Sequence, residues 1–429
     1  MKTVIRNTLL DNKVQDILIE GTKIRDIGQN LAEAPPDVRV LSGGGTAALP
    51  SLVNAHTHSP MVLLRGAGDE LPLDEWLITR MWPLEREFTE DDFYWGNRLA
   101  MVEMICGGTG FFNEMYMQPR IALKALEDVP LKGMIHYPII DGMDSEVGKS
   151  MWDDCTKFFA EVSPPRGVGL GVALHSVYSD SRESIEWVRD FTREAGLKVH
   201  IHLSETQKEV EDCLGNHEGR TPVEYLRDLG LLSNRVLAAH AVHLSDNDID
   251  ILAGFGVTVI HNPVSNMKFG TGVFPYRKLK DRNVRILLGT DGAGSNNNLD
   301  MLEEMKIATL MQKVYTEDAA SMPAEEILNI AGTAGAEYFA TGGGTIEIGK
   351  EADIMLLDIS DPQMTPLWNL SSALVYSANS GNVKTLISAG RVLMEDGVVP
   401  GYEKVRSEAL ECQRRLFGIH KEQENRGIG

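Results

Sequence analysis

One pattern of hydrophobic and polar positions repeats from about residue 51 to residue 292. Each repeat is a short apolar run rich in β-branched residues or glycine, followed by a longer segment with helical spacing. This alternation is typical of parallel strands joined by crossover helices. We predict eight strands, at residues 51–58, 107–116, 131–140, 168–175, 198–205, 236–243, 257–264 and 284–292. Eight parallel strands can close into a (β/α)8 barrel.

Polar side chains gather at the C-terminal ends of most of these runs. They are His56, His58, His175, His202, His240 and Asp291. Barrel enzymes build their active sites from these strand ends. An open doubly wound sheet would bind its ligand at one switch point, and no G-x-G-x-x-G motif follows the first strand. The sequence therefore predicts an α/β fold of the TIM-barrel class with its site at this rim.

The two ends of the chain have a different pattern from the middle. A chain of 429 residues is longer than a barrel of about 250 residues requires. Residues 1–50 and 345–400 have the pattern of short strands and turns, and we expect them to pair as one small β-sandwich. The barrel, residues 51–344, separates them in sequence. Residues 401–429 have helical periodicity, and we expect this helix to pack on the outside of the barrel.

Composition narrows the class of partner. Hydrophobic residues make up 43% of the chain and charged residues 24%, which is typical of a soluble globular enzyme. The formal charge of -21 argues against nucleic acid as a partner, because binding a polyanion requires a basic surface. A small neutral substrate fits better. Homo-oligomers are common among such enzymes, although no sequence feature marks an interface.

Targeting features point to the cytoplasm. Arg6, Asn7 and Asp11 interrupt the N-terminal apolar run, which argues against a signal peptide, and no run approaches about 18 uninterrupted apolar residues. We therefore expect no membrane association. The four cysteines lack C-x-x-C spacing, so neither a thiolate zinc site nor a disulfide framework is indicated, and a reducing compartment is the simplest setting.

Three of the strand ends carry residues that could hold a metal. His56 and His58 are two positions apart on a strand, so both face the barrel interior. A lone H-x-H pair is also compatible with two polar-layer histidines. His202, nearer the rim than His200, is the better third ligand, and Asp291 follows the strand that closes against the first, although alone it could be a turn or capping residue. Three imidazoles and one carboxylate suit Zn²⁺, and Fe²⁺ or Mn²⁺ would also fit.

The fourth strand bears on the number of metal ions. Its sequence, GVGLGVALHSV, contains no lysine that could be carbamylated to bridge two metals. We therefore predict a mononuclear site. A single activated water favours a deamination-type hydrolysis over a dinuclear mechanism.

Five motifs, in chain order, resemble the amidohydrolase superfamily. They are PSLVNAHTHSPMVLLRGAGDELPLDEWL, HIHLSET, AAHAVHL, HNPVSNMKFGTG and LGTDGAGSNNNLDMLEEM. Within the superfamily they are most similar to the 5-methylthioadenosine/S-adenosylhomocysteine deaminases and related aminohydrolases and chlorohydrolases. The later segment GGGTIEIGKEADIMLLD also resembles that family's return into the sandwich.

The resemblance implies catalytic roles. The metal ligands would be His56, His58, His202 and Asp291. Glu205 would be the acid/base that moves a proton to the purine ring nitrogen, and His240 would hydrogen-bond the hydrolytic water. Asp291 would also help to pass a proton to the leaving ammonia. From sequence alone, Glu205 could instead cap a helix and His240 could be an interior histidine with structural partners.

Substrate-binding residues follow from the same resemblance. The segment LPLDEWLITRMWPLE would close over the substrate, with Glu85 accepting hydrogen bonds from the ribose hydroxyls. Trp82, with Trp76, could line the pocket, although aromatic residues at this spacing are also typical of core. His175 would contact the substrate, but its surroundings, ALHSVYSDS, depart from the family pattern. Glu85 could instead belong to a surface helix.

The implied reaction is removal of the amino group from adenosine, 5′-methylthioadenosine or 5′-deoxyadenosine, giving the inosine analogue and ammonia. S-adenosylhomocysteine carries a charged tail, and the resembling enzymes bind its carboxylate through arginines after the third strand. Here that region, HYPIIDGMDSEVGKS, has no arginine and only Lys149 as a cation. Asp141, Asp144 and Glu146 would repel a carboxylate if they faced the pocket. A neutral 5′ group is therefore favoured.

Two other functions remain open from the sequence. One is hydrolysis of another N-heterocycle, such as guanine, a pterin or an s-triazine, by an aminohydrolase or chlorohydrolase. Glu85 discriminates here, because a free base has no ribose to bind. The other is a non-catalytic scaffold, which would have no use for a complete ligand set beside Glu205. The sequence assigns no role to His200, His243 or His261.

Overall fold

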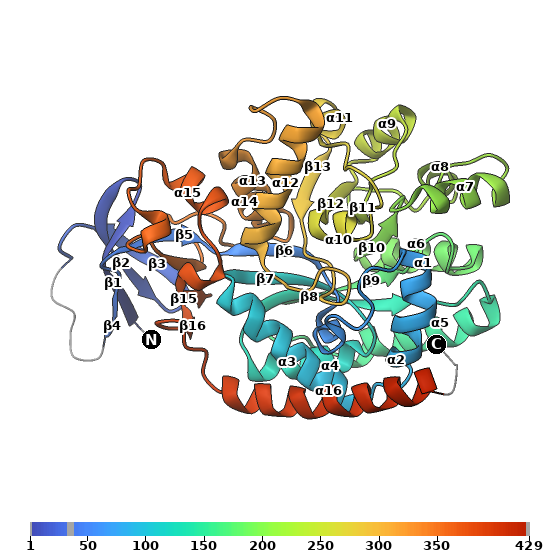
Figure 1. Ribbon diagram of the computed structural model, residues 1–429, viewed down its shortest axis with the longest axis horizontal. Helices are drawn as coiled ribbons and strands as arrows, with labels where there is room; N and C mark the ends of the chain where they lie inside the picture. The colour runs from blue at the N-terminus through green and yellow to red at the C-terminus, as the bar shows by residue number, and fades with distance from the viewer. Residues whose placement is uncertain (1, 32–37, 426–429) are drawn as a thin grey trace.

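The protein is described by a computed structural model that covers residues 2–31 and 38–425. A parallel sheet of eight strands forms a barrel in the order β13-β12-β11-β10-β9-β8-β7-β6 (Figure 1). Its strands are β6 (Leu52–Thr57), β7 (Thr109–Met115), β8 (Lys132–Ile139), β9 (Val168–Leu174), β10 (Lys198–Leu203), β11 (Val236–His240), β12 (Thr258–His261) and β13 (Arg285–Leu288). Each lies inside a predicted strand range, so the predicted barrel is confirmed.

The barrel closes between its first and last strands. Past the end of β13, the backbone N–H of Asp291 donates to the His56 carbonyl at 3.0 Å. Thr57 and Asp291 also form an isolated parallel bridge. The eight-stranded barrel is nearly closed, and this bridge brings the end of β13 beside the end of β6.

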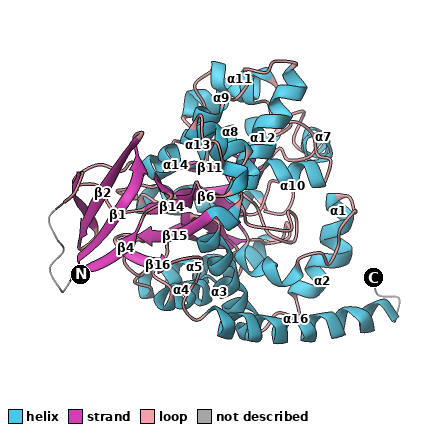
Figure 2. Cartoon of the chain, turned by 60° about the vertical axis from the view of Figure 1, so that its left-hand side comes forward, coloured by secondary structure: helices cyan, strands magenta, loops and turns pink. Residues whose placement is uncertain are grey.

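Helices surround the barrel strands (Figure 2). The longer ones are α3 (Glu90–Cys106), α4 (Pro119–Asp128), α5 (Ser145–Glu161), α6 (Arg182–Ala195), α7 (Gln207–Asn216), α9 (Asp246–Phe255), α12 (Met301–Thr316) and α13 (Ala324–Ala331). The shorter ones are η1 (Ser59–Leu64), α1 (Leu73–Trp76), η2 (Leu77–Met81), α2 (Trp82–Glu85), α8 (Pro222–Asp228), α10 (Pro263–Lys268), α11 (Tyr276–Asp281), α14 (Thr333–Tyr338), η3 (Pro362–Met364), α15 (Leu370–Tyr376) and η4 (Ser380–Asn382). Side-chain caps begin several helices; Ser245 and Thr221 each form a capping box.

The barrel strands are buried on both faces, because helices cover them outside and side chains, several of them polar, fill the inside. Val172, Val199 and Ile201 are fully or almost fully buried within one large cluster. Such near-continuous burial is typical of parallel sheets. The rigid strands therefore provide a fixed frame for the polar residues at their C-terminal ends.

The terminal segments form a second, mixed sheet of eight strands. Its order is β16-β15-β14-β5-β1-β2-β3, and β4 pairs with β1. The strands are β1 (Lys2–Leu10), β2 (Lys13–Glu20), β3 (Lys23–Gly28), β4 (Arg39–Ser42), β5 (Thr46–Pro50), β14 (Ile354–Asp358), β15 (Val383–Ser388) and β16 (Arg391–Met394). Side chains from both halves of this path, such as Ile17 and Ile387, share one core. The N- and C-terminal segments are joined where β5 pairs antiparallel with β14.

The chain ends in the long helix α16 (Tyr402–Asn425), which runs along α3 and α2 outside the barrel (Figures 1 and 2). Ala409 and Leu416 of α16 are buried, and Arg415 of the same helix forms an ion pair with Asp92 of α3. Residues 426–429 of the predicted helical segment lie outside the described residues. Within residues 2–31 and 38–425, no helix is both long enough and apolar enough to cross a membrane.

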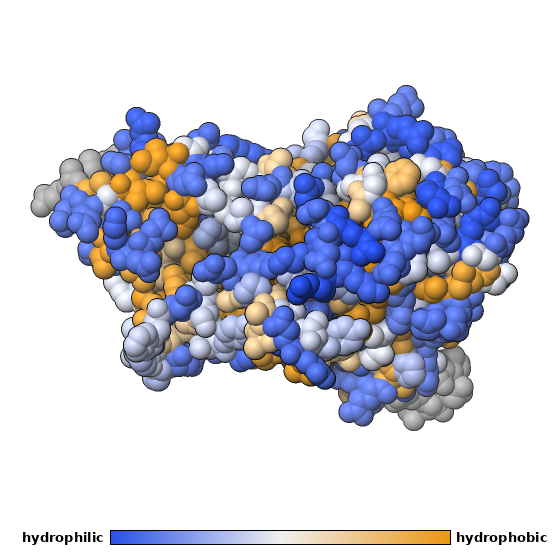
Figure 3. Space-filling view, turned by 90° about the horizontal axis from the view of Figure 1, so that it is seen from above, coloured by the Kyte–Doolittle hydropathy of each residue, from blue (hydrophilic) through white to orange (hydrophobic). Residues whose placement is uncertain are grey.

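Seen from above relative to the view of Figure 1, the molecular surface is largely hydrophilic, with hydrophobic residues gathered over the terminal sheet and in smaller patches elsewhere (Figure 3).

A buried ion pair joins the barrel to the terminal sheet. Lys132 at the start of β8 bonds to Asp353 just before β14, and their side chains are only 7% and 5% exposed. Lys132 Nζ also donates to the Thr341 carbonyl at 3.0 Å, and the Ala389 N–H donates to Asp353 at 2.8 Å.

Replacing Lys132 with methionine should destabilise the fold, because Asp353 would be left buried without its cation. Removing one partner of a buried pair typically costs about 3–5 kcal/mol. Equilibrium denaturation in urea should therefore show a clearly lower midpoint for Lys132→Met. The matched variant Lys149→Met removes an exposed pair with Glu146 and should leave the midpoint unchanged. Equal midpoints for the two variants would contradict a structural role for the Lys132–Asp353 pair.

Candidate functional site

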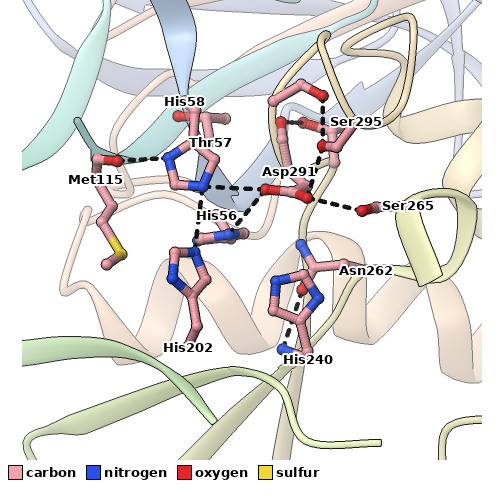
Figure 4. Close-up of polar contacts among 12 residues, drawn as sticks. His56, Thr57, His58, Met115, His202, His240, Asn262, Ser265, Asp291 and Ser295 are labelled. Carbon is pink, nitrogen blue, oxygen red and sulfur yellow. Dashed lines mark hydrogen bonds and ion pairs between the residues drawn. The ribbon is translucent and has the colours of Figure 1, made fainter. Parts of the chain in front are cut away.

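Four side chains converge at the C-terminal rim of the barrel (Figure 4). His56, His58, His202 and Asp291 each place one ligand atom within 4.8 Å of the others. Asp291 Oδ1 lies 3.1 Å from Nε2 of His56 and 3.1 Å from Nε2 of His58. The Nε2 atoms of His58 and His202 are 3.2 Å apart. These are the four residues that the strand spacing predicted, and they form a His-His-His-Asp metal site.

The spacing of the donor atoms fits one divalent transition metal. Bonds of about 2.0–2.1 Å to a tetrahedral Zn²⁺ place the ligand atoms roughly 3.4 Å from one another. The separations of 3.1–3.2 Å for three of the pairs are close to that value, and all four donor atoms lie within 4.8 Å of one another. His56 Nε2 is buried and makes no hydrogen bond among the described residues. Burial lowers the pKa of His56 and of His202, which keeps both rings neutral with a lone pair available to a cation.

Backbone carbonyls fix the orientation of two ligand rings. His58 Nδ1 bonds to the Met115 carbonyl, and His202 Nδ1 bonds to the His175 carbonyl at 2.9 Å. A carbonyl can only accept, so Nδ1 of each ring carries a proton. In a neutral ring Nε2 is then the unprotonated nitrogen that can bind a metal. Such outer contacts orient ligands in metal sites generally. Burial lowers the pKa of His58, but its contact with the Asp291 carboxylate outweighs burial and raises that pKa.

His200 supports the ring of His56. It lies one layer below His202, is fully buried, and its Nε2 is 3.0 Å from His56 Nδ1. The Asn113 amide is 3.1 Å from the other ring nitrogen of His200 and also donates to the Ala55 carbonyl at 2.7 Å. His200, to which the sequence assigned no role, thus packs behind the metal site and fixes His56.

Two serines hold the carboxylate. The hydroxyls of Ser265 and Ser295 each donate to Asp291 Oδ2 at 2.7 Å. Because Oδ2 is occupied, Oδ1 is the oxygen that faces the histidines. Sequence reasoning missed both serines. The only signal was their position inside the HNPVSN and GTDGAGSN motifs, and no spacing rule links either of them to Asp291.

Glu205 lies beside the metal site on the cavity wall. It is 7% exposed, and its Oε1 is 3.5 Å from His240 Nδ1. The backbone N–H groups of Ser204 and Glu205 each donate to the carboxylate of Glu209 at 2.8 Å, which fixes the turn after β10. Burial raises the pKa of Glu205 well above its usual range. Burial therefore favours the protonated, neutral form of Glu205.

His240 is held in one protonation state. Burial lowers the pKa of His240 to about 3, so the ring is neutral. The Asn266 amide donates to its Nδ1 at 3.1 Å, which leaves the proton on Nε2. Asn266 is another residue that the sequence did not identify. Its neighbour Ser265 holds Asp291, so one turn of α10 orients two groups of the site.

Two further histidines, His243 and His261, are not among the four grouped ligands. His261 is buried and stacks on Phe274 with ring centroids 4.2 Å apart. His243 Nε2 bonds to the Thr271 carbonyl. Neither side chain is part of the metal site.

A cavity of about 570 Å³ opens above the metal site. Its walls include the three predicted substrate-binding residues, Glu85, Trp82 and His175, together with Glu205 and His240. The structure therefore brings every predicted site residue to one place. Trp82 is 37% exposed at the mouth of the cavity.

The charges around the cavity differ in part from expectation. Asp141 lines it, but its carboxylate accepts hydrogen bonds from the backbone N–H groups of Met143 and Ser181 at 2.9 and 2.8 Å. Asp144 caps α5, and neither it nor Glu146 lines the cavity. Arg86, which follows α2, does line it. A cation is therefore present, although it is outside the region where the sequence analysis looked for one.

Replacing both Ser265 and Ser295 with alanine should weaken metal binding, because Asp291 would lose the donors that fix its orientation. Loss of such outer contacts typically costs roughly 10–100-fold in metal affinity. Competition against a calibrated chelator would measure the change. Ser321→Ala, at a buried serine remote from the site, serves as the matched control. Equal affinity in the double variant and the wild type would rule out this role for the serines.

Comparison with known proteins identifies the family of the chain. Residues 47–393 match the model of the Amidohydrolase family. A 5'-deoxyadenosine deaminase of Methanoregula boonei is 43% identical over 410 residues, covering 94% of this chain and 92% of the relative. A 5-methylthioadenosine/S-adenosylhomocysteine deaminase of Pyrococcus abyssi is 39% identical, covering 92% and 93%. The crystal structure of an adenosine deaminase from Xanthomonas campestris with bound zinc superposes with a TM-score of 0.89 at 28% identity, covering 97% and 98%.

Proposed function

The chain belongs to the amidohydrolase family, and from this we propose that it removes the exocyclic amino group of an adenine nucleoside as ammonia. The observation that carries the proposal is the His-His-His-Asp metal site with Glu205 beside it in one cavity. The relatives that are 43% and 39% identical over nearly the whole chain are named as deaminases of adenine nucleosides. The reaction converts the amino-substituted ring carbon to a carbonyl.

Zn²⁺ is the metal that we propose for this site. Nitrogen and oxygen donors suit it, and a solved relative that is 28% identical contains zinc. Fe²⁺ and Mn²⁺ bind the same donors, so availability would also influence occupancy. When bound, such a cation lowers the pKa of a water molecule from about 15.7 to about 7, which supplies a nucleophile at neutral pH.

The protein groups handle the protons. Glu205 is buried and neutral, and it donates its proton to ring nitrogen N1 of the purine as the amino-bearing carbon is attacked. His240 presents an Nε2–H group, which hydrogen-bonds the attacking oxygen. Asp291 is the second carboxylate beside the metal position, and we assign to it the transfer of a proton from the added water oxygen to the amino group, so that the C–N bond breaks, ammonia leaves and the carbonyl forms.

Substrate binding uses the upper cavity. We propose that Glu85 accepts hydrogen bonds from the ribose hydroxyls and that Trp82 and His175 pack around the nucleoside. Met117, Ile140 and Met151 also line the cavity and favour a neutral, apolar 5′ group such as methyl or methylthio. Arg86 also lines the cavity and is a cation that could pair with a carboxylate, so S-adenosylhomocysteine is a further substrate to test.

Removing the metal should abolish ammonia release. Enzyme treated with chelator should not deaminate adenosine, 5′-methylthioadenosine or 5′-deoxyadenosine, and about one equivalent of Zn²⁺ per chain should restore activity. Ammonia release measured for each substrate, with guanine and an s-triazine included, tests the proposal. Faster turnover of a free base than of any nucleoside would contradict it.

Replacing Glu205 with glutamine should lower kcat at least about 100-fold, because the amide cannot donate a carboxylic acid proton to the ring. The metal content should stay at the wild-type value, since Glu205 is not a ligand. Glu211→Gln, at an exposed position on α7, is the matched control and should retain full activity. A Glu205→Gln variant with nearly wild-type kcat would remove Glu205 from the mechanism.

A further inference from the structure

Tyr116 joins the barrel rim to the segment above it. It is the first residue after β7, and its hydroxyl donates to Oε1 of Glu85, the last residue of α2. Both side chains line the cavity. Within residues 2–31 and 38–425, the Glu85 carboxylate has no second hydrogen bond. This bond therefore determines where the carboxylate points.

The tyrosine is itself held firmly. Its ring packs against Phe93, with centroids 6.1 Å apart, and against His58, with centroids 5.9 Å apart. The Tyr116 hydroxyl is the donor in this contact, because a carboxylate oxygen can only accept. Burial raises the pKa of Glu85, and the hydrogen bond from Tyr116 opposes that shift. The Tyr116 hydroxyl is thus a fixed donor to the half-buried carboxyl group of Glu85.

A carboxylate that binds a diol must be placed accurately. Glutamate has a long side chain, and holding it in one rotamer costs conformational entropy. A bond already present before binding reduces that cost when the ligand arrives. Tyr116 occupies Oε1 and leaves Oε2 available to hydroxyl donors in the cavity.

We propose that Tyr116 is a positioning residue for ribose recognition, which holds Glu85 so that its carboxylate can accept both hydroxyls of a ribose cis-diol. The inference rests on the proposed function, because it requires a nucleoside in the cavity. It assigns to Tyr116 an effect on substrates that carry the diol and none on substrates that lack it. A purely structural tyrosine would affect both kinds of substrate alike.

The test compares adenosine with 2′,3′-dideoxyadenosine in wild type and Tyr116→Phe. The variant should lose about tenfold in kcat/KM for adenosine, the typical effect of one hydrogen bond, and less than about twofold for the dideoxy substrate. Glu85→Gln should show the same selective loss. The double variant should lose little more than Glu85→Gln alone, because the two residues act through one interaction.

Controls separate this effect from damage to the fold. Tyr137→Phe changes a tyrosine on β8 that does not line the cavity, and it should leave the adenosine to dideoxyadenosine ratio unchanged. Metal content and thermal midpoint report whether each variant is intact. If Tyr116→Phe does not fold, Glu85→Asp shortens the side chain away from the tyrosine while keeping the charge, and the same comparison of substrates applies.

The outcomes are distinguishable. If Tyr116→Phe leaves the ratio of kcat/KM for adenosine to that for dideoxyadenosine unchanged, whether or not both values fall, the inference is overturned while the deaminase function stands. A wild-type enzyme loaded with metal that releases no ammonia from any adenine nucleoside overturns the proposed function, and the inference with it. A selective loss for adenosine supports both.

Discussion

The closing contact between β6 and β13 is the constraint on which the rest of the site depends. It joins the Asp291 N–H to the His56 carbonyl and so places a carboxylate 3.1 Å from two imidazole nitrogens. A buried carboxylate among neutral rings is costly unless a cation or hydrogen bonds compensate it. Ser265 and Ser295 supply two hydrogen bonds, and the nitrogens supply a place for a cation. The contact that closes the barrel therefore also positions Asp291 for metal binding.

Around the metal site, a hydrogen-bond partner outside the site fixes each functional group. Carbonyls hold the rings of His58 and His202, and Asn266 sets the proton position of His240. Glu209 fixes the turn that carries Glu205. The site thus meets substrate with its donors and acceptors already oriented, which is the arrangement that makes electrostatic catalysis effective. Glu205, His240 and the metal-site residues His58, His202 and Asp291 all line the cavity that a nucleoside would fill.

The sequence predicted the parts of this arrangement that follow from periodicity. The strand period of two put His56 and His58 on one face, and the repeated strand and helix pattern put Asp291 at the same rim. It could not predict the supporting contacts, such as Ser265 with Asp291 or Tyr116 with Glu85. Those pairs are 26 and 31 residues apart and come from different elements. Their pairing depends on the conformation of the loops and on where α2 packs on the barrel. No local sequence pattern determines either of these.

The central claim is that one metal ion is bound by three imidazoles and one carboxylate. X-ray absorption spectroscopy on the purified protein, combined with elemental analysis, tests it most directly. The account predicts one divalent transition metal per chain, with only nitrogen and oxygen neighbours at about 2.0–2.2 Å and the outer scattering of three imidazole rings. Two metals per chain, a sulfur neighbour, or scattering from fewer than three imidazoles would contradict it.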